Sequence, residues 1–304
     1  MLANFFGKSN PANYIILFVV FIAYASGAIF GGYLEEAGLI KLISLVGGVS
    51  VLFFLFNLIL TKIKLTLYNT YGFMFFVLLL ASFPQTFIDS EALMINILLL
   101  IMLRRVYSLQ ITKSVVKKMF DSGFWLGILF ILDPFMVVFA GLIYSSIALF
   151  QKLDLRNFLI PILGFATPLI CYFSYCFWND MTADFYQLFY LYTDYNYVVY
   201  AENEVLVPII IIGIVTLISI VFKTPRVIQV SGDYRIFWTL VIFNLLVSII
   251  FVLLTKDKTG AELLCTFFPL AVILTNGIEG FSKSLFKDIV IALFVLMPII
   301  LFII

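Results

Sequence analysis

The sequence contains no histidine. Imidazole is the usual general base near neutral pH and the commonest metal ligand in proteins. Its absence excludes a serine or cysteine triad built on histidine and every histidine-ligated metal centre. Any acid–base chemistry must therefore fall to aspartate, glutamate, lysine or tyrosine side chains.

Cysteines and nucleotide-binding motifs are also scarce. The chain has three cysteines, Cys171, Cys176 and Cys265, and each lies in an apolar stretch, so we expect core thiols and no disulfides. The sequence has no CxxC pair, no GxGxxG fingerprint and no GxxxxGK[ST] loop, and so gives no sign of a P-loop ATPase domain.

Charge is sparse as well, and apolar residues take its place. Of the 304 residues, 12% are charged and 64% are hydrophobic, and long uncharged runs recur from end to end. This pattern is typical of a polytopic membrane protein and predicts an all-α bundle of transmembrane helices that forms a single domain, residues 1–304. A net charge of +1 favours no nucleic-acid partner. Membrane lipids are the expected surroundings.

Eleven apolar segments are long enough to consider as membrane spans. They are residues 13–33, 38–61, 67–85, 92–105, 119–132, 135–150, 157–177, 205–222, 235–255, 260–277 and 288–304. Segments 92–105 and 119–132 are short for a hydrocarbon core of about 30 Å, so the expected count is 11, or nine if this pair does not cross.

The distribution of charge predicts the orientation. With the N-terminus in the cytoplasm, every basic residue except Lys41, Lys256 and Lys258 falls on the cytoplasmic side, as the positive-inside rule requires. Twelve of the 17 acidic residues fall on the outer side. This bias suggests that the functional polar groups lie at the outer face.

Two segments between spans stand out. The outer segment 178–204 has many aromatic and acidic residues and no basic one, and "TADFYQLFYLY" predicts a surface helix with Thr182 as its N-cap. It fits either an aromatic belt or a substrate platform. The cytoplasmic loop 104–121 carries five basic residues and fits either a topology determinant or a docking site for a membrane-protein partner.

Acidic residues near the outer ends of the spans are the candidate chemical groups. Glu35 and Glu36 follow the first span, and Asp89 and Glu91 follow the third. Carboxylates at such positions could serve as a general base and as ligands of a divalent metal. The alternative is helix capping, with Glu36 in the first turn of one span and Asp89 or Ser90 capping another.

Two further features have both a local and a functional interpretation. Asp133 before Pro134 is an ionisable residue inside an apolar run, but it also matches a helix start with an aspartate N-cap and a proline at the first helical position. Lys41, Lys256 and Lys258 are the cations expected outside, and Lys256 and Lys258 lie where a lipid phosphate would meet the tenth span. A simple polar turn is the alternative for this pair.

Two stretches carry a resemblance to known proteins. "LRRVYSL…KKMFDSGFWLGILFILDP" together with "LRNFLIPILGF" is similar to an uncharacterised family of inner-membrane proteins of Bacteroidota. The order of the parts, with acids in the first two outer loops and "KDKTGAELLCTFFPLAVIL" near the end, distantly resembles the C-type glycosyltransferase superfamily (GT-C).

The resemblance implies a function and assigns roles. It implies a bacterial inner-membrane enzyme that uses a polyprenyl-phosphate sugar at the periplasmic face, with Glu35 or Glu36 as base, Asp89 and Glu91 at a metal, and Lys256 and Lys258 at the lipid phosphate. The first outer loop is shorter than that superfamily usually has, and its acids are Glu-Glu where an aspartate usually leads. A reduced relative, a non-enzymatic subunit or scaffold of an envelope, secretion or motility complex, and a transporter of lipid or small solutes are the alternatives.

Overall fold

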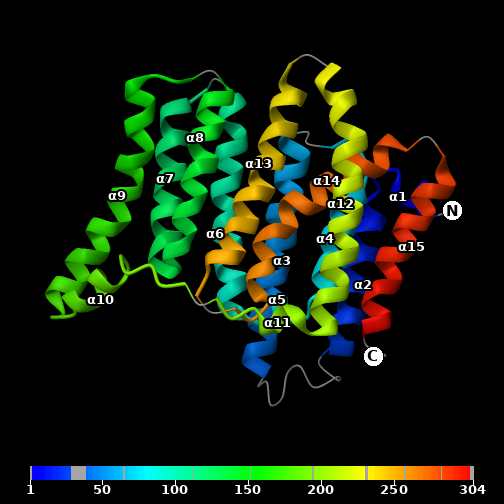
Figure 1. Ribbon diagram of the computed structural model, residues 1–304, viewed down its shortest axis with the longest axis horizontal. Helices are drawn as coiled ribbons and strands as arrows, with labels where there is room; N and C mark the ends of the chain where they lie inside the picture. Colours follow the sequence, from blue (N-terminus) through cyan, green and yellow to red (C-terminus); the bar gives the residue numbers. More distant parts are fainter. Residues whose placement is uncertain are drawn as a thin grey trace. The chain divides into compact units, whose positions relative to one another are not determined.

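The structure, a computed structural model, describes most of the chain. The described ranges are residues 2–28, 39–63, 66–111, 113–150, 152–193, 195–229, 232–256, 258–281 and 283–301. Within them every regular element is a helix, as the sequence predicts (Figure 1). The chain divides into two compact units. Two of the four boundaries between them fall inside helices α6 and α13, and the other two fall at residues 195/196 and 257/258, between helices.

Unit 1 comprises Met1–Met94, Asn196–Arg235 and Lys258–Ile304. Its helices are α1 (Leu2–Phe6), α2 (Pro11–Ala28), α3 (Leu39–Ile63), α4 (Tyr71–Ser82), α5 (Gln85–Ile88), the start of α6 (Ser90–Tyr107), α11 (Val198–Ala201), α12 (Asn203–Gln229), η4 (Ala261–Leu263), α14 (Leu264–Gly280) and α15 (Ser284–Leu301).

Unit 2 comprises Ile95–Tyr195 and Ile236–Asp257. It contains most of α6 and of α13 (Asp233–Leu254), together with η2 (Ser108–Gln110), α7 (Val115–Leu132), η3 (Pro134–Phe139), α8 (Ala140–Leu149), α9 (Leu155–Trp178) and α10 (Thr182–Gln187).

Seven helical segments of the described chain are long and apolar enough to cross a membrane, so the protein is a multi-pass membrane protein. The seven are Pro11–Ala28, Ile43–Lys62, Ser90–Gln110, Leu155–Trp178, Asn203–Val227, Tyr234–Leu254 and Ala261–Gly280. Each of the eleven predicted segments contains a helix. The prediction of a polytopic helix bundle is thus confirmed.

The two segments predicted to be short are longer than their apolar runs. The helix expected at 92–105 is α6, which spans Ser90–Tyr107, and the one expected at 119–132 is α7, which begins at Val115. Each has 18 residues, which is about 27 Å of helix at 1.5 Å per residue. Helical hydrogen bonding continues through the charged ends, whose long side chains can still reach a polar surface.

Helices α4 and α14 form the core of unit 1. Every residue of α4 is buried, and so is 94% of the span that contains α14. The two helices pack against each other, with α2 and α15 also on α4 and α12 on α14. Stacked rings of Phe56 and Phe76, with centroids 4.1 Å apart, fill the space beside α4. The 12 residues of α4, too few to span a bilayer alone, are thus shielded by other helices.

The N-terminal helix α1, which the sequence did not predict, is held to unit 1 by polar contacts. The backbone N–H of Ala3 donates to Asp288 Oδ1 at 2.8 Å, and the Tyr71 hydroxyl donates to the Ala3 carbonyl at 2.5 Å. Asn13, buried at the start of α2, donates its amide to the carbonyls of Phe5 and Lys8. These hydrogen bonds hold α1 in place, and no apolar run in the sequence predicts this helix.

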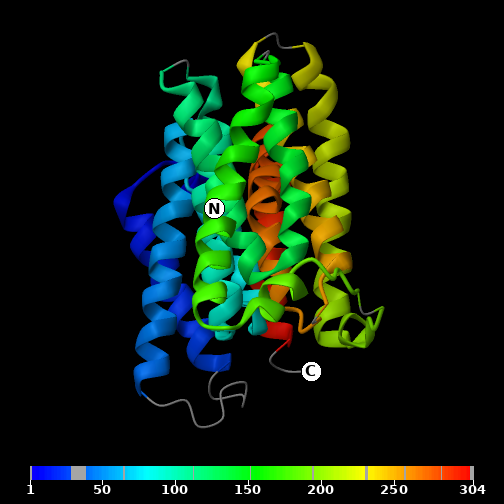
Figure 2. The same ribbon diagram turned by 90° about the vertical axis from the view of Figure 1, so that its left-hand side faces the viewer.

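Helices α7 and α9 of unit 2 lie side by side at close range (Figures 1 and 2). A Cβ atom added to Gly123 would lie 2.0 Å from the Pro161 carbonyl oxygen, and one added to Gly164 would lie 2.2 Å from the Phe120 carbonyl oxygen. Only glycine allows the two backbones to approach this closely, as in small-residue packing of membrane helices.

The predicted surface helix in the segment 178–204 is present but short, and its predicted cap is wrong. Helix α10 covers Thr182–Gln187, and its N-cap is Met181, which makes no side-chain cap hydrogen bond. The N–H of Asp184, which a capping Thr182 could have bound, donates to the Met181 carbonyl at 3.1 Å. A backbone acceptor thus replaces the hydroxyl.

The α7–α9 contact yields a stability prediction. We expect Gly123→Ala to lower the free energy of unfolding by about 2 kcal/mol or more, because the new methyl group forces the helices apart. Gly213→Ala in α12 is the matched control, because no atom lies within 4 Å of its added Cβ. Thermal unfolding in detergent, followed by circular dichroism, measures both. Equal melting temperatures for the two variants would contradict the close packing.

Candidate functional site

The turn that leads into α14 holds a buried carboxylate. Glu262, on η4, is 9% exposed. Its Oε1 accepts a short hydrogen bond from the Tyr200 hydroxyl, and its Oε2 accepts from the N–H and the hydroxyl of Thr259 at 3.2 and 3.4 Å. All the partners are donors, which is the environment that an ionised carboxylate requires.

Gly260 allows this turn to pack against α5. Its φ is +85°, a left-handed conformation that favours glycine. An added Cβ would lie 2.9 Å from Gln85 Nε2, so the site also lacks room for a side chain. Helix η4, which contains Glu262, contacts α5, the short helix that precedes Asp89.

Helix α11 and its N-cap residue supply two tyrosines to the same turn, Tyr200 and Tyr197. The Lys258 ammonium nitrogen lies 4.8 Å from the centroid of the Tyr197 ring, within cation–π range. The rings of Tyr197 and Tyr200 are 6.3 Å apart. Burial and the neighbouring Glu262 carboxylate raise the pKa of Tyr200, so its hydroxyl remains a proton donor at any physiological pH. We call Tyr197, Lys258, Thr259, Glu262 and Tyr200 the Glu262 cluster.

Asp89 caps α6, as the capping interpretation predicts. Its Oδ1 accepts from the N–H groups of Glu91 and Ala92 at 2.9 and 3.2 Å. The side chain of Glu91 is exposed. Within the described ranges no three acidic or cysteine side chains gather as metal ligands. A metal role for Asp89 and Glu91 stays a prediction, and this donor set alone does not fit a metal centre.

Four predicted site residues remain, Glu35 and Glu36 as base and Lys256 and Lys258 at the lipid phosphate. Glu35 and Glu36 lie outside the described residues, so their predicted role as base is untested. Lys256 is exposed, and Lys258 is half-buried in the Glu262 cluster. Of the predicted residues, Lys258 thus lies in the turn whose helix η4 contacts α5, the helix that precedes Asp89.

Asp133 is a helix N-cap, the local one of its two predicted roles. Its Oδ1 accepts from the N–H of Phe135 at 2.9 Å, with Pro134 at the first position of η3. Its Oδ2 accepts from the Thr255 hydroxyl at 3.1 Å. The prediction of an N-cap is confirmed.

The basic segment 104–121 is mostly helical and uses several of its cations internally. Arg105 pairs with Asp121 at 3.3 Å. The Lys118 ammonium donates to the carbonyls of Ser108 and Ile111 at 2.7 and 2.9 Å. Lys152, from the α8–α9 connection, donates to the Leu109 carbonyl, and burial lowers the pKa of its ammonium group. These contacts fold the segment onto unit 2.

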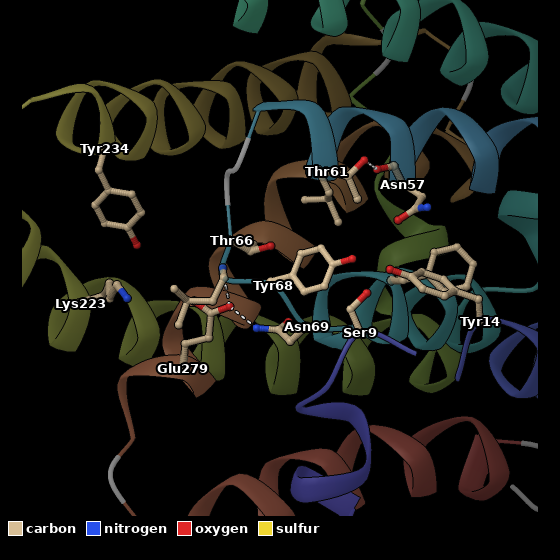
Figure 3. A pocket seen from close by; sticks show the side chains of 13 residues that line it. Ser9, Tyr14, Asn57, Thr61, Thr66, Tyr68, Asn69, Lys223, Tyr234 and Glu279 are labelled. Carbon is tan, nitrogen blue, oxygen red and sulfur yellow. Dashed lines mark hydrogen bonds between the residues drawn. The ribbon is translucent and has the colours of Figure 1, made fainter. Parts of the chain in front are cut away.

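Unit 1 also contains a cavity of about 670 Å³, lined by both polar and apolar side chains, that sequence reasoning missed (Figure 3). Glu279, near the end of α14, lies at one end of it with Lys223 and Tyr234, while Tyr14 and Asn57 lie at the other. Its residues come from the ends of α3, α12 and α14, the starts of α2, α4 and α13, and the segment 66–69. A cavity assembled from so many chain segments leaves no local sequence signal.

The Glu262 cluster was likewise missed as a unit. The sequence signal was an acid, Glu262, inside an otherwise apolar run, but its partner Tyr200 is 62 residues away. Only the tertiary structure joins them.

Comparison with known proteins gives a family without a function. The protein-family model described as "Family of unknown function (DUF6427)" matches residues 1–304. No curated protein and no solved structure matches the chain.

Because Tyr200 donates to Glu262, we expect the stability of the protein to fall with rising pH in the alkaline range. Because folding raises the pKa of Tyr200, this residue contributes fully to stability below about pH 10, the pKa of tyrosine in the unfolded chain. The contribution is lost as the pH rises above that value toward the pKa in the folded protein. We therefore expect Tyr200→Phe to cost about 1–2 kcal/mol at neutral pH.

The wild type should then lose stability faster than Tyr200→Phe between about pH 10 and pH 11. Unfolding in detergent at stepped pH measures this. Parallel pH curves for the two proteins would show that Tyr200 does not donate to a buried charge.

Proposed function

We propose that this chain, which belongs to the DUF6427 family of unknown function, transfers a sugar from a polyprenyl phosphate to an acceptor at the outer face of the bacterial inner membrane. In this proposal the eleven segments cross the membrane with the N-terminus inside, in a GT-C-like arrangement. The Glu262 cluster is the outer site at which the lipid phosphate is held.

The observation that carries the proposal is the composition of the Glu262 cluster. It combines a lysine, two tyrosines and a buried carboxylate at the start of an apolar span, in contact with α5. A lysine ammonium is a suitable partner for a phosphate at the membrane surface, and tyrosine faces suit an isoprenoid chain or a sugar. Glu262 positions the cluster by fixing Tyr200 and Thr259.

The reaction needs one displacement. The bond between the anomeric carbon and the phosphate oxygen breaks, and a bond forms from that carbon to the acceptor oxygen. The acceptor proton goes to a carboxylate, for which we propose Glu35 or Glu36. The polyprenyl phosphate leaves as an anion, which Lys258, assisted by Lys256, would stabilise. No step is assigned to a metal.

A second function is favoured by one specific observation. Aromatic side chains of the segment 178–204 are widely exposed, with Trp178 at 87%, Tyr190 at 79% and Tyr195 at 76%. Such a surface is typical of a protein contact or of a membrane interface. The second candidate is therefore a non-enzymatic subunit or scaffold of an envelope complex.

Transfer of label from a radioactive polyprenyl-phosphate sugar in isolated membranes tests the first function. We expect the double variant Glu35→Gln, Glu36→Gln to lose at least about 100-fold of the transfer rate, because it lacks the base. Lys258→Gln should lose about tenfold or more, because the leaving group is less stabilised.

Lys283→Gln, an exposed lysine beyond the other end of α14, is the matched control and should transfer at the wild-type rate. Undiminished transfer by the double glutamate variant would rule out the assigned base. Equal label transfer in membranes with and without the protein would rule out the enzyme and favour the scaffold.

A further inference from the structure

The cavity of unit 1 that Glu279 and Lys223 line is at the end of α14 opposite the Glu262 cluster. Seventeen helical positions separate Glu262 from Glu279 in the sequence, about 25 Å at 1.5 Å per residue. α14 runs from the level of α5 and α11 to the opposite end of unit 1 (Figure 1). In the predicted orientation the cavity opens toward the cytoplasm, at the depth of the inner-leaflet headgroups.

The charges that line the cavity balance. Among its described lining residues, Lys223 is the cation and Glu279 the anion. The other polar groups are neutral hydroxyls and amides, on Ser9, Tyr14, Asn57, Thr61, Thr66, Tyr68, Asn69 and Tyr234. Beyond the lining, Arg226 acts electrostatically on Lys223, and Lys287 acts on Glu279. Because the lining itself presents one charge of each sign, it favours a ligand that also carries one charge of each sign.

Lys223 has hydrogen-bonding capacity to offer a ligand. Its ammonium nitrogen lies 5.6 Å from the centroid of the Tyr234 ring. The Glu279 carboxylate acts on it electrostatically, and the ammonium group carries three N–H donors. A half-buried ammonium in this state is suited to an acceptor such as a phosphate oxygen.

Glu279 has one oxygen engaged and one available. Its Oε1 accepts from the Asn69 side-chain amide at 2.6 Å and from the Leu67 N–H at 3.0 Å (Figure 3). Its Oε2 receives no hydrogen bond from the residues that the structure describes. The engaged oxygen fixes the carboxylate at the cavity wall, and the other is suited to an ammonium group.

We propose that this cavity binds a zwitterionic phosphate ester of the phosphoethanolamine type. The ligand's phosphate meets Lys223, and its ammonium group meets Glu279 Oε2. A purely anionic ligand would be repelled by Glu279, and a purely cationic one by Lys223. The volume of about 670 Å³ is ample for such a group, and the apolar sides of Leu60 and Phe73 can receive the carbon atoms attached to the phosphate.

The same chemistry has two sources, a lipid headgroup of the inner leaflet and a soluble phosphoethanolamine. The binding assay uses the full chain in detergent and three probes: short-chain phosphatidylethanolamine, short-chain phosphatidylglycerol and O-phosphoethanolamine. We expect the ethanolamine lipid to bind about tenfold or more tightly than the glycerol lipid, which lacks the ammonium group. Competition by O-phosphoethanolamine alone identifies a soluble ligand, and binding that requires acyl chains identifies a lipid.

Two variants test the proposed contacts with Glu279 and with Lys223 separately. Glu279→Gln keeps an oxygen for Asn69 and Leu67 and should abolish the preference for the ethanolamine lipid. Lys223→Gln should weaken the binding of both lipids about tenfold. Lys283→Gln, exposed and outside the cavity lining, is the matched control and should bind as the wild type does. Thermal unfolding confirms that each variant is folded.

Equal binding of the two lipids by the wild type would overturn the proposal, and so would binding of none of the three probes. A preference that survives in Glu279→Gln would overturn it as well. Undiminished binding of both lipids by Lys223→Gln would also overturn it, and this measurement keeps the test open if Glu279→Gln does not fold. These measurements need no glycosyl transfer, so the inference stands or falls independently of the proposed enzyme.

Discussion

The burial of α14 is the constraint on which the rest of unit 1 depends. Its membrane span is 94% buried, so its polar side chains must find partners within the protein. The span holds two acids, and each lies near one end. Glu262 is bound by Tyr200 and Thr259, and Glu279 by Asn69 and Leu67. The elements that supply those partners are thereby fixed around the helix.

This arrangement explains why the two polar sites have different character. Both oxygens of the Glu262 carboxylate accept hydrogen bonds, so in the proposed function a ligand contacts Lys258 and the tyrosine rings and not this carboxylate. Glu279 keeps one oxygen open toward a cavity, and Lys223 keeps its donors. In the two proposals, the first site holds an anionic lipid phosphate and the second holds a zwitterion. Two sites on one helix would allow the protein to engage ligands at both faces of the membrane.

Most local features could be predicted from the sequence, although the Thr182 cap was wrong, and non-local features could not. The apolar runs located every long helix, and the Asp133–Pro134 pair gave a correct cap, because both signals are local. Helix ends were missed at α6 and α7, where helical hydrogen bonding continues into charged residues. The pair Tyr200–Glu262 and the cavity depend on segments far apart in the chain. No spacing rule finds such contacts, and Glu35 and Glu36 remain predictions.

The central claim is that the two ends of α14 face opposite sides of the membrane. Labelling with a membrane-impermeant maleimide in sealed right-side-out vesicles tests it, using Glu202→Cys beside α11 and Lys283→Cys after α14, both exposed positions, with the exposed Cys171 replaced by serine. The account predicts that the cysteine at 202 is labelled in intact vesicles and that the one at 283 is labelled only after permeabilisation. Labelling of both from the same side, or the reverse pattern, would contradict it.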